Sequence, residues 1–390
     1  MAKKKNKFYD PSLAKRHAKD KIFKALAIGA LLLSLSFLAI FLTDMVVKGS
    51  SAVKQTYIQV EVTYNDTTIK SSRKAIDRKY RKLVSRAWLR EIPKHIKANP
   101  EYMNTTRLVW ALADDQVDMY MKEYYYKLKS KDLKTLQVMI ENNRVEKRFN
   151  TIFFTRGDSK IPEFSGILSS AIGTIFTLLV TMAVAFPIGV ATAVYLEEFA
   201  NQDSKWSQII EININNLAAI PSILFGLLGL AIFINLFGFP RSSALVGGLT
   251  LALMTLPIIV VTSRAALRSV PASIRQAGYG LGLTKVQVVR DHVIPLAFPG
   301  IMTGSIIGLA QAMGETAPLI IVGMIAFIPD APSSIMDAAT VMPAQIFTWA
   351  GMPERAYIER TAAGILVLLT VLISLNAFAV YLRKKFEVKW

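Results

Sequence analysis

The chain has 390 residues, of which 52% are hydrophobic and 19% are charged, and it carries a formal net charge of +18 with no cysteine. Soluble proteins average about 25% charged residues, so this composition favours a protein embedded in a membrane. The lack of cysteine excludes a disulfide framework, a thiol nucleophile and a cysteine-ligated metal. No recognisable nucleic-acid-binding module accompanies the positive charge, which gathers beside apolar runs and in one hydrophilic insert.

The N-terminal residues 1–24 form a basic tail with nine lysines or arginines. The apolar run 25–47 follows and ends near Asp44 and Lys48. A cleavable signal peptide has a shorter apolar core close to the N-terminus and a small-residue cleavage site. We therefore predict that residues 25–47 form a retained transmembrane helix.

Residues 48–160 form a hydrophilic insert with its own apolar pattern. Apolar and polar residues alternate from Ile58 to Tyr64, which predicts a strand that closes at Asn65 and Asp66. Helical spacing follows from Ile76 to Leu89, and two more helix-like stretches cover roughly 107–129 and 133–149. About 110 residues can bury a small core, so we expect a small α+β domain.

Residues 161–390 contain five further apolar segments, each long enough to cross about 30 Å of hydrocarbon. They lie at roughly 165–196, 217–237, 244–261, 297–328 and 361–382. With the first run, the sequence predicts an all-α polytopic membrane protein with six transmembrane helices. Basic residues in tails and short loops mark the cytoplasmic side. That rule places both termini and the basic loop 263–296 in the cytoplasm and the insert outside.

The basic loop 263–296 cannot cross a membrane, yet it contains helix-sized pieces. Pro271 suits the first turn of a helix, with Ser269 as its cap, and Gly278, Gly280 and Gly282 end that helix. The glycines lack the spacing of a nucleotide-binding phosphate loop. A linker that lies on lipid headgroups stays open as an alternative to a docking element.

A second helix in this loop is predicted to begin at Thr284 and to stop at Pro295. Gln287, three residues after Thr284, completes a capping box. Three valines share one face of this helix, while Lys285 and Arg290 point elsewhere; the valines are Val286, Val289 and Val293. The loop is thus a helix–turn–helix knob at the membrane surface, suited to being gripped by a partner.

This loop resembles the EAA loop of ABC-importer permeases of the MetI-like fold, which docks as a coupling helix on the ATPase subunit. Gln276, Ala277 and Gly278 stand where that family has Glu-Ala-Ala, and Gly282 falls on its characteristic glycine. Two residues depart from the pattern, because Gln276 has no carboxylate and Gly278 costs about 1 kcal/mol of helix propensity relative to alanine. The resemblance implies that these four residues and Lys285 couple the chain to an ATPase.

Other segments resemble the A-type permease of the Pst phosphate importer. They are Gly-Glu-Thr-Ala-Pro-Leu at 314–319, the stretches 215–230 and 249–257, and Tyr-Leu-Glu-Glu-Phe at 195–199. The resemblance covers roughly 161–382 and leaves out the insert. It implies a second, homologous permease subunit, a dimer of ATP-binding subunits and an extracytoplasmic phosphate-binding protein as partners. It also implies a multi-pass protein of the bacterial inner membrane, with ATP used by a partner and no cofactor in this chain.

Glu315 is an ionisable residue within the apolar segment 297–328. Such residues are rare in a membrane and usually face a cavity or a partner. Gln311 lies four residues earlier, on the same helical face, and Thr316 follows. We expect Glu315, Thr316 and Gln311 to form the substrate pathway or gate. A hydrogen bond from protonated phosphate, an ion pair with an arginine of the partner permease, and a structural lock between helices all remain open.

The sequence thus predicts the permease subunit of an ATP-driven importer of inorganic phosphate, without catalytic or metal-binding residues of its own. An intramembrane enzyme would need a second buried catalytic group, which the apolar segments lack. Two alternatives remain, namely a permease for another oxyanion such as molybdate or sulfate, and a membrane-anchored sensor or scaffold built around the insert.

Overall fold

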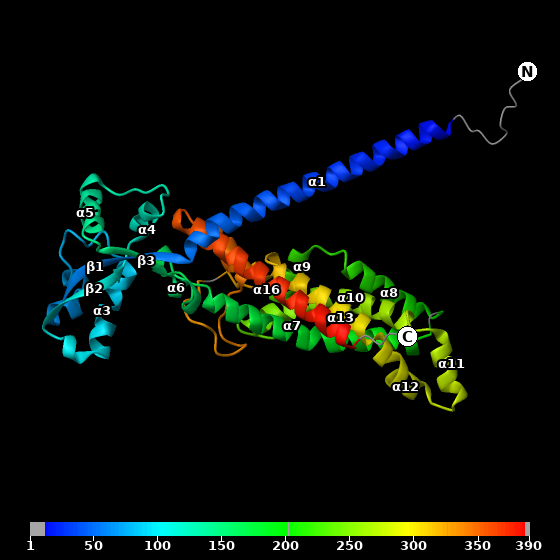
Figure 1. Cartoon of the computed structure of the whole chain (residues 1–390). Helices are drawn as coiled ribbons and strands as arrows, with labels where there is room; N and C mark the ends of the chain where they lie inside the picture. The colour runs from blue at the N-terminus through cyan, green and yellow to red at the C-terminus, as the bar shows by residue number, and fades with distance from the viewer. Residues whose placement is uncertain (1–11, 202, 326, 387–390) are drawn as a thin grey trace, which may run out of the picture.

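The computed structural model describes residues 12–201, 203–325 and 327–386. A small α+β domain, the insert, lies at one end of a helical bundle, and the long helix α1 (Leu13–Ala52) diverges from the bundle (Figure 1). The start of α1, the end of α16 (Ala356–Phe386) and the basic loop all lie toward the end opposite the insert (Figure 1). Residues 1–11 of the predicted basic tail lie outside the described part of the chain.

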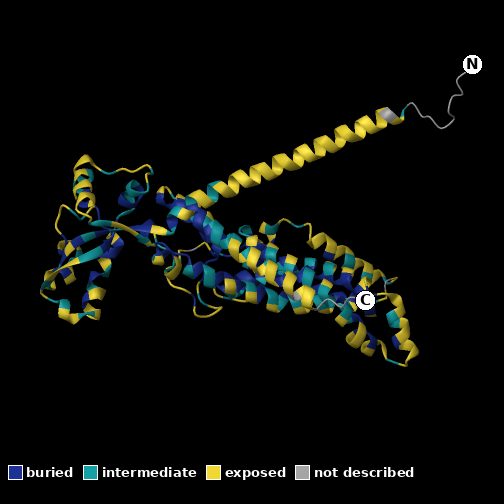
Figure 2. Ribbon diagram, viewed as in Figure 1, coloured by how far each residue is buried: buried dark blue, intermediate teal, exposed yellow. Residues whose placement is uncertain are grey.

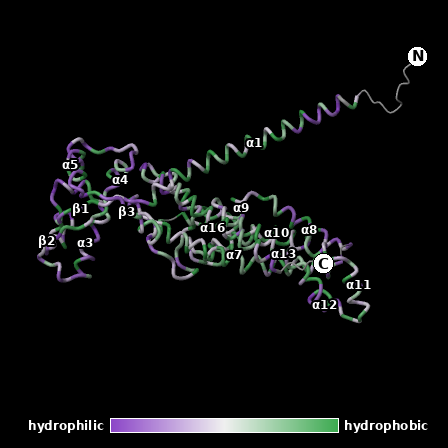
Figure 3. The backbone as a smooth tube through the Cα atoms, viewed as in Figure 1, coloured by the Kyte–Doolittle hydropathy of each residue, from purple (hydrophilic) through white to green (hydrophobic). Residues whose placement is uncertain are grey.

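Within the described residues, five helices are long and apolar enough to cross a membrane: Lys15–Ala52, Leu168–Phe199, Ala244–Arg268, Lys285–Gly314 and Ala356–Lys385. A bent pair, Lys205–Leu217 with Ser222–Leu236, makes a sixth if it counts as one span. Hydrophobic residues dominate the bundle and α1, whereas the insert is largely hydrophilic (Figure 3). The predicted polytopic all-α architecture with a small α+β insert is confirmed.

The insert is built on a three-stranded antiparallel sheet of order β2-β1-β3, with bounds β1 (Lys54–Tyr64), β2 (Thr105–Leu112) and β3 (Val145–Phe149). The predicted strand at 58–64 is confirmed and forms the centre of the sheet. Ile58, Val60 and Val62 are fully buried against Leu89 and Ile92. The helices of the insert are α2 (Asp66–Lys70), η1 (Ser72–Ala75), α3 (Arg86–Ala98), η2 (Pro100–Tyr102), α4 (Asp115–Met121) and α5 (Ser130–Glu141).

Parts of the predicted helices in the insert are wrong. The segment expected to be helical at 107–129 begins as β2, and the one at 133–149 ends as β3. Turns replace the helical pattern before Val84, and α3 begins only at Arg86. The cause is tertiary, because β1 needs a hydrogen-bonding partner at each edge, and pairing overrides a weak local pattern.

The bundle continues through α6 (Thr151–Thr155), η3 (Pro162–Phe164), α7 (Leu168–Val194) and η4 (Tyr195–Phe199), a π-helical turn that extends α7. Helix α10 (Ala244–Arg268) packs against α7 at very short range. A Cβ on Gly248 would lie 2.7 Å from the carbonyl oxygen of Thr177. Glycine therefore permits the close approach of these two helices.

The segment predicted as a span at 217–237 forms the second half of a bent pair of helices. Helix α8 (Lys205–Leu217) is followed at 104° by α9 (Ser222–Gly229) and the π-helical η5 (Leu230–Leu236). Pro221 stands at the bend with an extended backbone, φ −54° and ψ 134°. Proline donates no hydrogen bond and disfavours helix in the residue before it, so the chain restarts its helix after Pro221.

The helix found in place of the span predicted at 297–328 begins earlier and ends earlier than expected. One helical path runs from Lys285 to Gly314 through α12 (Lys285–Val288), the π-helical η6 (Val289–Val293) and α13 (Ile294–Gly314). The prediction that Pro295 stops the loop helix is therefore wrong, since Pro295 lies at the start of α13, just after a π turn has shifted the hydrogen-bond register. Beyond Gly314 come the short α14 (Ala317–Ile321), an irregular stretch and α15 (Met342–Ala350).

A buried ion pair cluster anchors the insert to the bundle. The ammonium of Lys122, just after α4, lies 2.7 Å from Asp118 and 2.9 Å from Glu359 of α16, and all three side chains are about 5% exposed. Ser51 at the end of α1 donates a 2.6 Å hydrogen bond to Glu359. Asp118 also accepts hydrogen bonds from the amide and hydroxyl of Thr56 in β1. One lysine thus joins the insert to α16, and through Glu359 to α1.

Replacing this lysine tests the anchor. Lys122→Met leaves two carboxylates buried without their cation, and losing one partner of a buried pair costs about 3 to 5 kcal/mol. We expect a clearly lower melting temperature of the purified protein in detergent. Lys147→Met is the matched control, because Lys147 is exposed on β3. Equal melting temperatures for the two variants would contradict the role of Lys122.

Candidate functional site

The basic loop folds as two short helices, α11 (Ala272–Gly280) and α12, that leave the end of α10. The capping box at Thr284 is confirmed, since the Thr284 amide donates to Gln287 at 2.8 Å and the Gln287 amide donates to the Thr284 hydroxyl at 3.4 Å. Ser269 does not cap α11 as predicted. Its hydroxyl donates to the carbonyl of Ala266 at 2.7 Å, within the last turn of α10.

Glycine holds the two helices of the loop together. A Cβ on Gly278 would lie 2.7 Å from Cγ2 of the buried Val288, so α11 and α12 are in direct contact at this glycine. Gly282 has φ +80°, a backbone conformation that favours glycine. The predicted end of the first helix at the glycines is confirmed, because α11 stops at Gly280.

The predicted valine face of the second helix is partly wrong. Val289 and Val293 are buried as expected, but Val286 is 59% exposed and Val288 is fully buried instead. The π-helical η6 causes the difference, since its wider turn brings residues five apart onto one face. Val288 and Val293 have this spacing.

The outer surface of the loop carries the residues predicted to meet an ATPase. Gln276, Ala277 and Lys285 are exposed. Leu281 at the tip is 81% exposed. Gln276 forms no side-chain hydrogen bond or ion pair with any residue that the structure describes.

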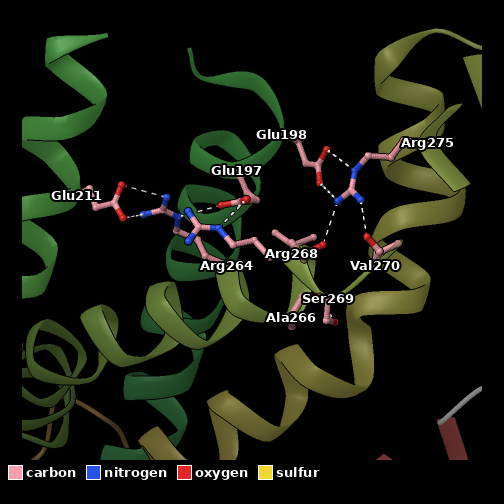
Figure 4. A network of polar contacts seen from close by, with 10 residues as sticks. Glu197, Glu198, Glu211, Arg264, Ala266, Arg268, Ser269, Val270 and Arg275 are labelled. Carbon is pink, nitrogen blue, oxygen red and sulfur yellow. Dashed lines mark hydrogen bonds and ion pairs between the residues drawn. The ribbon is translucent and has the colours of Figure 1, made fainter. Parts of the chain in front are cut away.

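The inner side of the loop is fixed by a carboxylate–guanidinium network at the end of the bundle (Figure 4). Arg264 of α10 is 9% exposed and lies 3.3 Å from Glu197 of η4 and 3.2 Å from Glu211 of α8. Arg268, one turn further on, donates to the other oxygen of Glu197 at 2.8 Å. These contacts lock α8 and α10 to the end of α7.

Arg275 connects α11 to the same network (Figure 4). It donates to Glu198 at 2.5 Å and to the carbonyl oxygens of Leu267 and Val270 at 3.0 and 2.8 Å. The guanidinium therefore joins α11, η4 and the last turn of α10. A cation at a helix C-terminus also interacts favourably with the helix dipole. Movement of α11 must therefore move the ends of α7 and α10.

Sequence reasoning assigned no function to Glu197 and Glu198. A signal was present, because two adjacent carboxylates directly follow an apolar span, and Arg264 and Arg268 stand four residues apart on a later one. Residues four apart share a helix face. Only the fold brings the acidic and basic pairs together.

The second candidate site is the helix break at Glu315. Glu315 does not lie within one continuous helix, as the span predicted at 297–328 implies, since α13 ends at Gly314 and Glu315 has an extended backbone, φ −76° and ψ 131°. Glu315 and Thr316 are half-buried and Gln311 is exposed. Among the described residues, the Glu315 carboxylate has no hydrogen-bond or ion-pair partner. The structure thus brings the three predicted residues to one place, about 30 Å from the basic loop by the length of α13.

Helix α9 packs against α14, the short helix that follows this break. A Cβ on Gly226 would lie 2.9 Å from the carbonyl oxygen of Pro318 and 2.9 Å from Cβ of Ile321, so α9 and α14 are in direct contact. Pro318 stands in the first turn of α14, where its missing N–H costs nothing. The packing of α9 on α14 therefore stabilises the chain directly after the break.

Comparisons with known proteins bear on these two sites. Residues 185–388 match the family described as "Binding-protein-dependent transport system inner membrane component". This is just over half of the chain and includes both sites. The chain belongs to this family. Residues 10–79 and 71–130, which cover much of α1 and of the insert, match a family described only as a domain of unknown function.

Among curated relatives, the chain is 31% identical over 219 residues to "Phosphate transport system permease protein PstA 1" of Mycobacterium tuberculosis (strain CDC 1551 / Oshkosh), which covers 56% of this chain and 70% of the relative. It is 34% identical over 169 residues to "Probable ABC transporter permease protein YqgI" of Bacillus subtilis (strain 168), 43% of this chain and 56% of the relative. Among solved structures, an inward-facing MetNI methionine ABC transporter aligns at 17% identity with a TM-score of 0.43, over 57% of this chain and 95% of that chain.

The Arg275–Glu198 pair yields a first test of the loop. In Glu198→Gln the guanidinium loses a charged acceptor, so we expect the amides of α11 to exchange hydrogen at least about tenfold faster, as measured by mass spectrometry. Asp291→Asn is the control, because it breaks the exposed Arg290–Asp291 pair of the same loop. Exposed pairs contribute about 0 to 1 kcal/mol. Unchanged exchange in Glu198→Gln would show that the network does not hold α11.

The glycine contact yields a second test. Gly278→Ala gains helix propensity, but its methyl group collides with Val288, so we expect a net loss of about 1 kcal/mol of stability in thermal unfolding. At Gly280 no atom lies within 4 Å of an added Cβ, so Gly280→Ala should be neutral or stabilising by up to about 1 kcal/mol. Adding Val288→Ala to Gly278→Ala should relieve the collision. If Gly278→Ala proves as stable as Gly280→Ala, the close packing is not required.

Proposed function

We propose that this chain is the transmembrane permease subunit of an ATP-driven importer of inorganic phosphate. The assignment of phosphate as the substrate rests on the 31% identity over 219 residues to a permease protein named for phosphate transport. Family membership over residues 185–388 supports the general role in binding-protein-dependent transport. On this proposal an extracytoplasmic phosphate-binding protein delivers the substrate.

The basic loop is the coupling element of the proposed permease. Its exposed face, with Gln276, Ala277 and Lys285, would dock on an ATP-binding subunit, and two such subunits would hydrolyse ATP. Force applied to α11 would pass through Arg275 to Glu198 and the carbonyls of α10, because these contacts are short and largely buried. This chain itself would hold no cofactor and no catalytic residue.

The Glu315 break is the substrate pathway or gate on this proposal. Irregular backbone at membrane depth is tolerated where it lines a polar cavity or packs on protein. The unpartnered carboxylate, with Thr316 and Gln311 beside it, would face a second, homologous permease subunit. Two mechanisms are open for Glu315, which would accept a hydrogen bond from protonated phosphate or pair with an arginine of the partner.

The proposed topology follows the distribution of basic residues. The N-terminal tail, the basic loop and Arg383 to Lys385 at the end of α16 would lie in the cytoplasm, with the insert outside. The start of α1, the basic loop and the end of α16 lie toward one end of the molecule, which is compatible with this orientation (Figure 1). The domain division proposed is a tail at 1–24, a first membrane helix at 25–47, an insert at 48–160 and a permease core at 161–390.

Neutralising the carboxylate of Glu315 tests whether it belongs to the substrate pathway. In cells that depend on this importer, Glu315→Gln should lower the uptake of radiolabelled phosphate by at least about tenfold, as expected when one charged hydrogen bond of about 1.5 to 3 kcal/mol is lost. Glu354→Gln is the control, since Glu354 is exposed beside the start of α16. Equal uptake by both variants would remove Glu315 from the pathway.

The same assay separates the alternative substrates. Excess molybdate or sulfate should leave phosphate uptake by the unmodified protein unchanged. Strong competition by either anion would instead favour the other-oxyanion permease. Deletion of the insert would abolish the output of a sensor built around that domain, whereas uptake through the permease core should persist.

A further inference from the structure

The insert contains a cleft of about 520 Å³ lined by twelve residues, of which seven are lysine or arginine and two are aspartate. The basic residues come from two separate segments, 73–86 and 127–129. We call it the cationic cleft. Its size falls within the range of about 300 to 1,000 Å³ that is typical of small-molecule sites. Six of these seven basic residues are exposed and Arg81 is half-buried, so the cleft presents their charges to the solvent.

Few of these cations are neutralised by the protein itself. Among the described residues, the only ion pair within the cleft joins Lys82 and Asp132 at 4.0 Å. Arg81 is held in place by a 3.0 Å hydrogen bond to the carbonyl of Ile76. The guanidiniums of Arg78 and Arg86 have no hydrogen-bond or ion-pair partner in the described part of the chain. The cleft therefore presents both fixed and free donors to a ligand.

Arg86 stands where a cation is unfavourable for the fold alone. It is the first residue of α3, a helix of 13 residues with no acidic residue in its first turn. The positive end of the helix dipole repels a cation there and attracts an anion. Ser85 caps the amides of Ala87 and Trp88. With these amides capped, it is the Arg86 guanidinium that lines the cleft and is available to an anion.

Asp114 also lines the cationic cleft, but it repels an anion less than an ordinary aspartate would. Burial, aided by repulsion from Asp115 and Glu163, raises the pKa of Asp114 to about 8. The raised pKa reduces the negative charge that Asp114 contributes to the cleft at neutral pH.

We infer that the cationic cleft binds a small anion that carries several phosphoryl groups, of the condensed-phosphate class represented by tripolyphosphate. Guanidinium groups match phosphoryl oxygens in bidentate geometry. The volume and the excess of cations exceed what one orthophosphate needs. A concave site lined by cations also suits a small polyanion better than the broad acidic surface of a protein. The choice of phosphate over other anions rests on the proposed function, whereas the presence of a cationic cleft does not.

Titration calorimetry of the full chain in lipid nanodiscs tests this inference. Sodium tripolyphosphate at pH 7 and physiological salt should bind saturably with one site, at least about tenfold more tightly than orthophosphate. Arg86→Gln should weaken tripolyphosphate binding by at least about tenfold. Arg90→Gln is the matched control, since Arg90 is exposed one turn along α3 and outside the cleft. It should change the affinity by less than about twofold.

Folding and competing outcomes are separated by further measurements. Arg86→Gln removes an unfavourable charge at the N-terminus of α3, so its melting temperature should not fall, and Arg86→Lys should retain part of the affinity. The inference is overturned by absent saturable binding or by equal losses in Arg86→Gln and Arg90→Gln. It is also overturned if the cleft instead binds an extracytoplasmic protein that Arg86→Gln releases. Phosphate uptake is a different readout, so failure of the proposed transport leaves this binding test intact.

Discussion

The hydrogen bonds of Arg275 are the interaction on which the rest of the loop depends. One guanidinium binds Glu198 and two carbonyl oxygens at the end of α10, and these partners come from two elements other than its own. Because bidentate and charge-assisted bonds of a partly buried guanidinium are among the stronger polar contacts, α11 cannot shift alone. The outer face of the loop stays free for a partner while the inner face is fixed.

Two π-helical turns of the bundle carry residues of the loop and of its network. In η4 the two glutamates meet different arginines, Glu197 binding Arg264 and Arg268 while Glu198 binds Arg275. In η6 the wider turn carries the chain through Pro295 without a break and selects Val288 for burial. Irregular turns in this bundle therefore set which side chains meet.

The insert carries its positive charge in two different environments. At its base, Lys122 is buried between two carboxylates, and the cluster joins the domain to α16 and α1. Most of the remaining positive charge is exposed, and part of it lines the cationic cleft. Figure 2 shows the same contrast, with buried segments at the junction and exposed ones toward the periphery of the domain. The first kind stabilises the fold, whereas the second is available to bind.

Local sequence signals were sufficient where one short pattern decides the structure. Apolar length marked the membrane segments, alternation marked β1, and Thr284 with Gln287 marked the start of α12, because each depends on residues within a few positions. The remainder was decided by contacts between distant segments. Strands β2 and β3 form because β1 has two open edges. The bend at Pro221 and the break at Glu315 are supported by packing of α9 on α14. Glu198 meets Arg275 only when α7, α10 and α11 are assembled, since no local pattern relates residues 77 positions apart.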